Sequence, residues 1–224
     1  MQSKPTQRPS GIEGYAERAD VLAAQYESIA FADLHRDMLH LLPLHPSRVL
    51  DVGAGTRRDA AALAGMGHHV TAVEPTQEFR AHGNRLHSEA GIEWIDDVLP
   101  NLDRVRTRHT QFNLILLTAV WMHLDSDGRR VAMRRVADLL APSGLIVMSL
   151  RHGPVPADRR MFDVSAEETC DLAKESGLRV VHRSEREDML GRADVRWTFL
   201  GFRNLPEVEE PATPPLPTPD PRRT

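Results

Sequence analysis

The segment LDVGAGTRRDAAALA, residues 50 to 64, carries the most information about the fold of this chain. An apolar run at 48–52, RVLDV, leads through a turn with Gly53 and Gly55 into an alanine-rich stretch. Glycine adopts positive φ angles at little cost and, because it has no Cβ, lets a ligand approach the backbone. The segment therefore predicts a strand, a turn that contacts a small molecule, and a helix over about 59–66.

The same order of strand and helix recurs along the chain. Further strand-like runs, each followed by a stretch typical of a helix, occupy 69–74, 92–95, 112–118 and 145–150. Alternating strands and helices predict a parallel sheet covered on both faces. The last two runs, 178–185 and 194–202, have no helix between them, which predicts an antiparallel hairpin at one edge of the sheet.

The composition divides the chain into one folded unit and two tails. Residues 1–13 are polar, and 206–224 are so rich in proline that neither helix nor sheet is expected there. We expect both tails to be disordered and 14–205 to form one domain. Within it, 14–42 has apolar residues at helical spacing and is predicted to form an N-terminal helical lid.

Charge and cysteine content argue against several classes of protein. The formal net charge is −4, so a nucleic-acid partner is unlikely. The single cysteine, Cys170, is compatible with a reducing compartment, and no stretch is apolar for long enough to span or enter a membrane. These features predict a cytoplasmic protein, and the absence of short helical histidine spacings predicts no metal site.

The glycine turn favours a cationic ligand. A dinucleotide site needs a third glycine where Arg58 stands, and no Gly-Lys-Ser/Thr follows for a phosphate loop. Asp51, at the strand end, would repel a pyrophosphate but suits a ligand with ammonium and sulfonium groups.

Two acidic positions after the next strands extend this site. Glu74 follows Gly55 by 19 residues, the place where a carboxylate accepts from ribose hydroxyls in Rossmann-type sites. Either Asp96 or Asp97 can accept from an adenine amine while the Val98 N–H donates to the ring. Asp96 can equally cap a short helix.

Five segments in this order resemble the class I S-adenosylmethionine-dependent methyltransferases: DVGAGT, VTAVEP, IDDVLPNL, FNLILLTAVWMHL and LLAPSGLIVMSL. The resemblance covers about residues 15 to 203. It implies a Rossmann-like three-layer α/β sandwich with a seven-stranded, mostly parallel sheet and an antiparallel C-terminal hairpin strand. It also implies that S-adenosylmethionine lies over the first three strand ends, leaving as S-adenosylhomocysteine, with the acceptor above strands four and five. The cofactor-binding residues expected on this basis are Asp51, Gly53, Ala54, Gly55, Thr56, Arg58, Glu74, Pro75, Asp96, Asp97, Val98, Thr118 and Ala119.

One position departs from the family pattern, because Arg57 stands where the third glycine of Gly-x-Gly-x-Gly is usual. A positive φ there would strain an arginine by about 1 kcal/mol or more, or its side chain would crowd the cofactor. Alternatively Arg57 points outward without harm and Arg58 reaches the cofactor carboxylate. We favour the second arrangement.

The candidate catalytic residues follow strands four and five. Methyl transfer from a sulfonium mainly needs alignment, so a catalytic base is optional. His123 and His152 are the candidate bases, and Arg151 can bind an anionic group of the substrate. Tyr26 and Trp121 are the other candidate substrate-binding residues.

We therefore expect a methyltransferase acting on a small molecule, as a monomer or homodimer. An RNA or protein methyltransferase is the first alternative, since Arg129, Arg130, Arg134 and Arg135 cluster on one predicted helix. The second is a non-catalytic binding protein whose cofactor loop is impaired by Arg57.

Overall fold

The computed structural model describes residues 14–88 and 91–204. The two tails predicted to be disordered, 1–13 and 206–224, therefore lie outside the described residues. Residue 205, the last of the predicted domain, also lies outside them.

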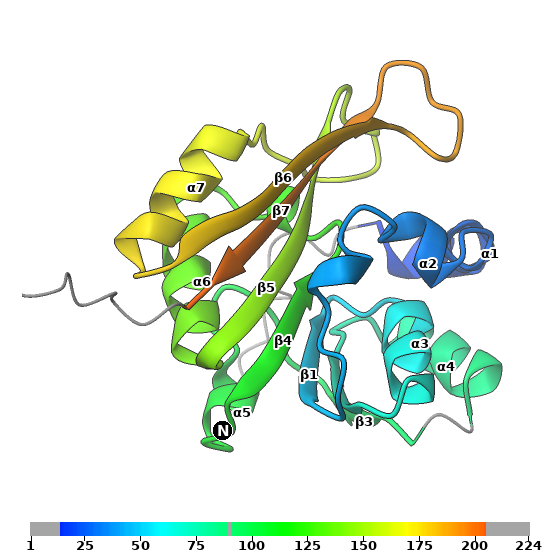
Figure 1. The fold of residues 1–224 in the computed structure, drawn as a ribbon. Coiled ribbons are helices and arrows are strands. Elements are labelled where there is room, and N and C mark those ends of the chain that lie inside the picture. Colours follow the sequence, from blue (N-terminus) through cyan, green and yellow to red (C-terminus); the bar gives the residue numbers. More distant parts are fainter. Residues whose placement is uncertain (1–13, 89–90, 205–224) are drawn as a thin grey trace, which may run out of the picture.

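A seven-stranded sheet forms the centre of the protein, with strand order β3-β2-β1-β4-β5-β7-β6 (Figure 1). β1 to β5 are parallel, and β7 is antiparallel to both β5 and β6. The predicted fold class is confirmed, including the C-terminal hairpin. The strands are β1 (Arg48–Val52), β2 (His69–Val73), β3 (Glu93–Ile95), β4 (Phe112–Leu117), β5 (Leu140–His152), β6 (Arg179–Glu187) and β7 (Arg196–Arg203).

Helices cover both faces of this sheet. On one side lie α5 (Asp103–Arg106), α6 (Ser126–Asp138) and α7 (Ala166–Glu175). On the other lie α3 (Arg58–Gly65), α4 (Gln77–Leu86) and the N-terminal helices α1 (Ala19–Glu27) and α2 (Phe31–Leu34). Short 3-10 turns are η1 (Ala16–Arg18), η2 (Leu39–Leu41) and η3 (Trp121–His123).

Strand alternation divides the apolar side chains between two cores. In β1, Leu50 belongs to the core under α5, α6 and α7, whereas Val49 belongs to the core under α3. Neighbouring residues of a strand point to opposite faces, so a continuous apolar run such as RVLDV serves a sheet covered on both sides. For this reason the strand sequences do not alternate between apolar and polar residues.

Two predicted boundaries differ from the structure. The strand expected at 145–150 begins at Leu140 and reaches His152. At its start, Leu140 pairs with Phe112 of β4. The strand extends to His152 because β7 pairs with it from Leu145 to His152 on the side away from β4. Such a pairing comes from a segment about 50 residues later and leaves no local pattern.

The order of the strands places a crevice above β1 and β4. The chain runs outward from β1 to β2 and β3, then returns to β4 on the other side of β1. Connections leave in opposite directions at this point, and ligands of open α/β sheets bind there, beyond the carboxyl ends of the strands. The glycine turn after β1 lies at this crevice.

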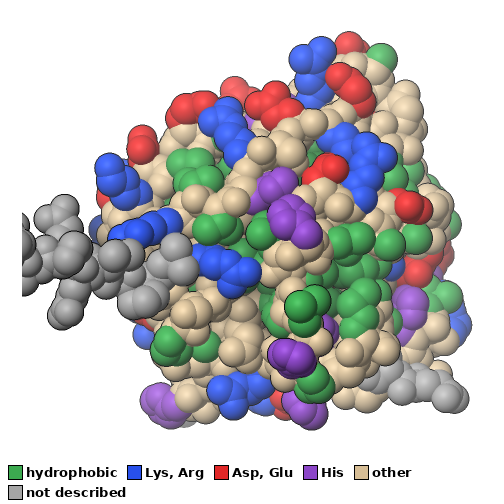
Figure 2. Space-filling model, in the orientation of Figure 1, with side chains coloured by type: hydrophobic (Ala, Val, Ile, Leu, Met, Phe, Trp, Pro, Cys, Tyr) green, Lys and Arg blue, Asp and Glu red, His purple; other side chains and the backbone are tan. Residues whose placement is uncertain are grey.

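The surface in Figure 2 has interspersed acidic and basic side chains over its upper part, with apolar side chains exposed in the middle and lower part. No helix among the described residues has the length and apolar character that crossing a membrane requires.

Candidate functional site

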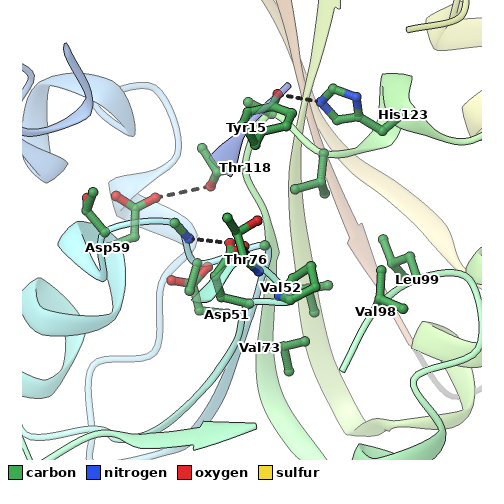
Figure 3. A pocket seen from close by; sticks show the side chains of 18 of the residues that line it. Tyr15, Asp51, Val52, Asp59, Val73, Thr76, Val98, Leu99, Thr118 and His123 are labelled. Atoms are coloured by element: carbon green, nitrogen blue, oxygen red, sulfur yellow. Dashed lines mark hydrogen bonds between the residues drawn. The ribbon is translucent and has the colours of Figure 1, made fainter. Parts of the chain in front are cut away.

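Two adjoining cavities open at the carboxyl ends of the parallel strands. The first, the cofactor-side cavity, encloses a space of about 1030 Å³ that is partly open to solvent. It is bounded by the ends of β1, β2 and β4, and Figure 3 shows Asp51 and Thr76 near its base and Tyr15 with His123 at its other end. The second, the acceptor-side cavity, measures about 850 Å³. The two cavities share Tyr15, Tyr26, Arg58, Thr118 and Ala119.

The glycine turn can form only without side chains at its base. Gly53 has φ 72°, and a Cβ there would overlap Cγ1 of Val120. The Gly53 and Ala54 N–H groups both donate to the carbonyl of Val73, at 2.8 and 2.9 Å. The turn is thereby anchored to β2 and presents its backbone to the cavity.

Glu74 connects the turn after β1 with the turn after β2. Its Oε2 accepts from the Gly55 N–H at 2.9 Å and its Oε1 from the Thr76 N–H at 2.8 Å. Burial raises the pKa of Glu74, and these N–H donors oppose the rise. The residue predicted from its spacing thus lies in the cofactor-side cavity, where each carboxylate oxygen retains a second lone pair for a ligand.

Asp51 is buried at the floor of the same cavity, and its Oδ2 has no hydrogen-bond partner among the described residues. Burial, and next the charge of Asp59, raise the pKa of Asp51 well above its ordinary value. A buried carboxylate oxygen without a donor is costly. The position therefore favours a cationic donor supplied by a ligand.

Asp59, in the first turn of α3, joins three parts of the chain. Its Oδ2 accepts from His35 Nε2 at 2.8 Å and from Thr118 Oγ1 at 3.1 Å, and its Oδ1 accepts from Arg58 Nε at 2.7 Å. Burial opposes its ionisation, but the charges of His35 and Arg58 outweigh this and lower the pKa of Asp59. In the sequence, Asp59 is distinguished only as the first residue of a predicted helix.

The two candidate acids after β3 are separated by the structure. Asp97 lines the cofactor-side cavity together with Val98, whereas Asp96 is 54% exposed, does not line it, and pairs loosely with Arg80 and Arg104. The helix cap is also made by Asp97, because its Oδ2 accepts from the N–H groups of Arg104 and Val105. Placing Asp96 at the site was an expectation that this geometry does not support.

Arg57 adopts the left-handed conformation that its glycine-like position requires, with φ 75°. Its side chain lines neither cavity. It is buried rather than turned to solvent, with Nη2 donating to the Ile92 carbonyl at 2.7 Å and Cζ 4.6 Å from the Trp94 ring centre. These contacts offset the backbone strain and keep the guanidinium away from the cavity.

The other predicted cofactor residues surround the same space. Arg58 lines both cavities, with Nε on Asp59 and Nη1 on the Tyr26 carbonyl at 2.7 Å. Thr56 donates to Glu27 at 2.5 Å, which ties the turn to the end of α1. Predicted residues that line the cavity in addition are Ala54, Gly55, Pro75, Thr118 and Ala119.

His123 lines the cofactor-side cavity next to Tyr15, which lines both cavities. Its Nδ1 is 3.0 Å from the Arg160 carbonyl and its Nε2 is 2.8 Å from the Tyr15 hydroxyl. A carbonyl only accepts, so Nδ1 carries the proton and, in the neutral ring, Nε2 accepts from Tyr15. The structure thus gives His123 the tautomer of a base directed at the cavity.

Two other predicted residues lie elsewhere. His152 follows Arg151 in β5 and points to the opposite face, where its Nε2 is 2.8 Å from Thr198 Oγ1. Trp121 is fully buried in the core with α6 and lines neither cavity. Strand alternation explains the first difference, and the turn η3, which directs Trp121 under the sheet edge, explains the second.

The acceptor-side cavity is built from segments far apart in the sequence. Arg151 and Tyr26 were expected there, and both line it. Arg159, Arg186 and Arg192 were not expected. No local motif marks them, because they come from the connection after β5, the end of β6 and the β6–β7 connection. Among the described residues, no group of histidine, cysteine and acidic side chains could hold a metal ion.

The sequence is similar to those of known methyltransferases. A family model described as a methyltransferase domain matches residues 49–144. A ubiquinone biosynthesis O-methyltransferase from Bradyrhizobium diazoefficiens is 29% identical over 142 residues, which cover 63% of this chain and 54% of that protein. The chain thus spans about half the length of this curated relative.

Solved structures share the fold. The N-methyltransferase NodS from Bradyrhizobium japonicum, in complex with S-adenosylhomocysteine, matches with a TM-score of 0.65 and 19% identity, covering 86% of this chain and 99% of that one. A 1,6-didemethyltoxoflavin-N1-methyltransferase from Burkholderia thailandensis matches with a TM-score of 0.57 and 20% identity, covering 92% and 94%.

Removing the Asp59 carboxylate should destabilise the protein strongly. We expect Asp59→Ala to lower the free energy of unfolding at pH 7 by about 3–5 kcal/mol, because it leaves buried His35 and Arg58 without their partner. Asp96→Ala, which removes an exposed acid, should cost less than about 1 kcal/mol. Urea unfolding followed by circular dichroism measures both, and equal effects would contradict the role given to Asp59.

The same carboxylate predicts the sign of a pH effect. Since the folded-state pKa of Asp59 is lowered, its stabilisation is present above the unfolded-state value of about 3.9. It is lost as the pH falls further, through the folded-state pKa. The difference in unfolding free energy between wild type and Asp59→Ala should therefore shrink as the pH is lowered below about 4.

Proposed function

We propose that this chain, which belongs to the class I family of Rossmann-like S-adenosylmethionine-dependent methyltransferases, transfers a methyl group from S-adenosylmethionine to an oxygen or nitrogen atom of a small molecule. The observation that carries the proposal is the buried Asp51 oxygen without a donor at the floor of a cavity closed by a glycine turn and Glu74.

The residues present fit S-adenosylmethionine. Asp51 would accept from its ammonium group, and Gly53, where a Cβ would overlap Val120, leaves room for the methionine portion. Glu74 would accept from the ribose hydroxyls. Asp97 and Val98 line the part of the cavity suited to adenine, with apolar contact from Leu99.

Charge also favours this cofactor. Asp51, Asp59 and Glu74 are all buried around the cavity, and Arg58 balances Asp59. The remaining negative potential attracts a ligand that carries ammonium and sulfonium charges. A dinucleotide, with its anionic pyrophosphate, would be repelled at the same place.

When bound, the cofactor supplies an electrophilic methyl group on a sulfonium. The protein aligns the acceptor, whose lone pair forms the new bond to carbon as the carbon–sulfur bond breaks and its electrons remain on sulfur. The acceptor's proton goes to Nε2 of His123. In this proposal the acceptor O–H or N–H takes the position that the Tyr15 hydroxyl occupies as donor to Nε2.

The N-terminal segment, proposed as a lid, restricts the size of the acceptor. Tyr15 and Tyr26 line both cavities, and the segment is fastened by Thr56 to Glu27 and by Asp59 to His35. A small molecule fits such a covered space. Two of the similar proteins, the ubiquinone biosynthesis O-methyltransferase and the 1,6-didemethyltoxoflavin-N1-methyltransferase, act on small molecules according to their names.

The arginine cluster that suggested RNA is largely committed to other contacts. Arg129 is buried, with Nη2 2.9 Å from Glu168, and donates to the Leu124 carbonyl. Arg130 pairs with Glu175 and Arg135 with Asp138. The pairs of Arg129 and Arg130 fasten α6 to α7, whereas the Arg135 pair lies within α6. These contacts favour the small-molecule acceptor over RNA.

Titration calorimetry with S-adenosylhomocysteine tests the proposed cofactor. We expect micromolar binding by the wild type and about 10–100-fold weaker binding by Glu74→Ala, which loses charge-assisted bonds to the ribose. Asp96→Ala, an acid outside the cavity, is the matched control and should bind within about twofold of wild type. Absence of binding by the folded wild type at millimolar ligand would refute the proposal.

The raised pKa of Asp51 predicts a pH dependence of this binding. The ligand's ammonium favours the ionised carboxylate, so affinity should fall as the pH drops through the Asp51 pKa, by up to about tenfold per pH unit. Asp51→Asn should bind more weakly at pH 8 and lose that part of the dependence. Calorimetry from pH 5 to 8 measures both profiles, and profiles that differ by a constant factor would contradict this.

Arg57→Gly tests the alternative of an impaired, non-catalytic site. Because the Arg57 side chain lines neither cavity, we expect the dissociation constant for S-adenosylhomocysteine to change by less than about threefold. Circular dichroism checks that the variant is folded. A large gain in affinity would instead favour a binding protein whose cofactor loop the arginine has disabled.

A further inference from the structure

The acceptor-side cavity combines apolar walls with an unbalanced positive charge. Apolar and aromatic side chains form much of its surface, among them Ile29, Met122, Met161, Leu190, Trp197 and Phe199. Apolar walls with a few charged groups are typical of sites for small organic molecules.

Most charged groups around this cavity are paired. Arg58 is bound to Asp59, and Arg192 to Asp188 with Nη2 to Oδ1 at 2.6 Å. Asp188 also accepts from the Trp197 indole N–H at 2.9 Å. Its neighbour Glu187 pairs with Arg196. Glu187 and Asp188, the two acidic residues that line this cavity, are therefore already paired with Arg196 and Arg192.

Arg186 is held as part of the cavity frame. It donates to the carbonyls of Asp33 and Leu34, lies 3.7 Å from Asp37 and stacks on the Phe199 ring with Cζ 4.3 Å from its centre. Its charge thus has a carboxylate nearby, and Arg186 joins β6 to α2 and to the segment after it.

Arg151 and Arg159 differ from these, because among the described residues neither has a carboxylate partner. Arg151 is 9% exposed and donates to the carbonyls of Gly153 and Pro154, at 3.2 and 2.9 Å. Arg159 stacks on the Tyr15 ring, with Cζ 4.8 Å from its centre, and its buried Nε has no partner. Burial, then the nearby Arg192, lower the pKa of Arg151. Asp188, which is paired with Arg192, opposes this lowering, and Arg159 adds to it.

Two mostly buried guanidinium groups that form no ion pair with a carboxylate of the described residues favour an anionic ligand. We propose that the acceptor is an apolar or aromatic molecule carrying an oxyanion, a carboxylate or a phosphate, which Arg151 and Arg159 bind while its methyl-accepting atom faces His123. The assignment rests on the proposed function and names the class of its acceptor. Arginine binds planar oxyanions through paired, charge-assisted hydrogen bonds.

Tyr15 links the two ends of this arrangement. Its ring carries Arg159 and its hydroxyl contacts His123 Nε2. An oxyanion bound at Arg159 would therefore lie beside Tyr15, the residue whose hydroxyl contacts the base. An aromatic acceptor that carries both an oxyanion and a hydroxyl or amine could contact Arg159 and His123 together.

The test uses the full chain saturated with S-adenosylhomocysteine. The probes are 4-hydroxybenzoate, indole-3-acetate and phenyl phosphate, beside the neutral 4-hydroxybenzamide, indole-3-acetamide and benzyl alcohol. Calorimetry should show at least one oxyanion binding tenfold or more tightly than its neutral counterpart. Tighter binding of the carboxylates or of the phosphate then shows which of these two groups the acceptor carries.

Variants attribute that preference to the two arginines. Arg151→Gln and Arg159→Gln should each reduce it by at least fivefold, and the neutral probes and S-adenosylhomocysteine should bind as before, within about threefold. Arg130→Gln, an exposed arginine on α6, should leave it unchanged. No preference for any oxyanion, or a preference that survives both substitutions, would overturn the inference. Failure of S-adenosylhomocysteine to bind would instead refute the proposed function.

Discussion

The Asp59 carboxylate is the interaction on which the rest of the site depends. It is buried, yet it is ionised because His35, Arg58 and Thr118 all contact it. Those partners come from the segment after α2, the start of α3 and the end of β4. One charge thus sets the distance between the N-terminal cover, the glycine turn and the strand on the far side of the crevice, and the two cavities lie between these three parts.

The electrostatics of the two cavities are opposite, although they share a wall. The cofactor-side cavity has buried carboxylates, and the Oδ2 atom of Asp51 lacks a donor among the described residues. The acceptor-side cavity has guanidinium groups that form no ion pair with a described carboxylate. Arg58 lies at the boundary and is neutralised by Asp59. In the function we propose, this separation gives a cationic methyl donor and an anionic acceptor complementary environments. It would orient their reacting ends toward the boundary near Tyr15 and His123.

Whether a site residue could be predicted from the sequence depended on its position in its strand or turn. Glu74 was identified from its spacing to the glycine turn, because both follow adjacent parallel strands whose ends meet at one edge. Asp96 and Asp97 could not be distinguished in the sequence, since they are neighbours and only one can face the cavity. The same alternation separated Arg151, which lines the acceptor-side cavity, from His152, which lies on the other face.

The sequence by itself determined the order of strands and helices, the C-terminal hairpin, and the glycine turn with its acidic neighbours, because these follow from hydrophobic periodicity and from backbone conformations that only certain residues adopt. Only the tertiary structure decided where Arg57 points, that Asp59 joins three segments, and that Arg151 and Arg159 form no ion pair with a described carboxylate. Those facts depend on which distant residues become neighbours: Ile92 and Trp94 hold Arg57, and α2 brings His35 to Asp59. Contacts made across long separations in the chain leave no periodic pattern in the sequence, so their energetics appear only when the fold is complete.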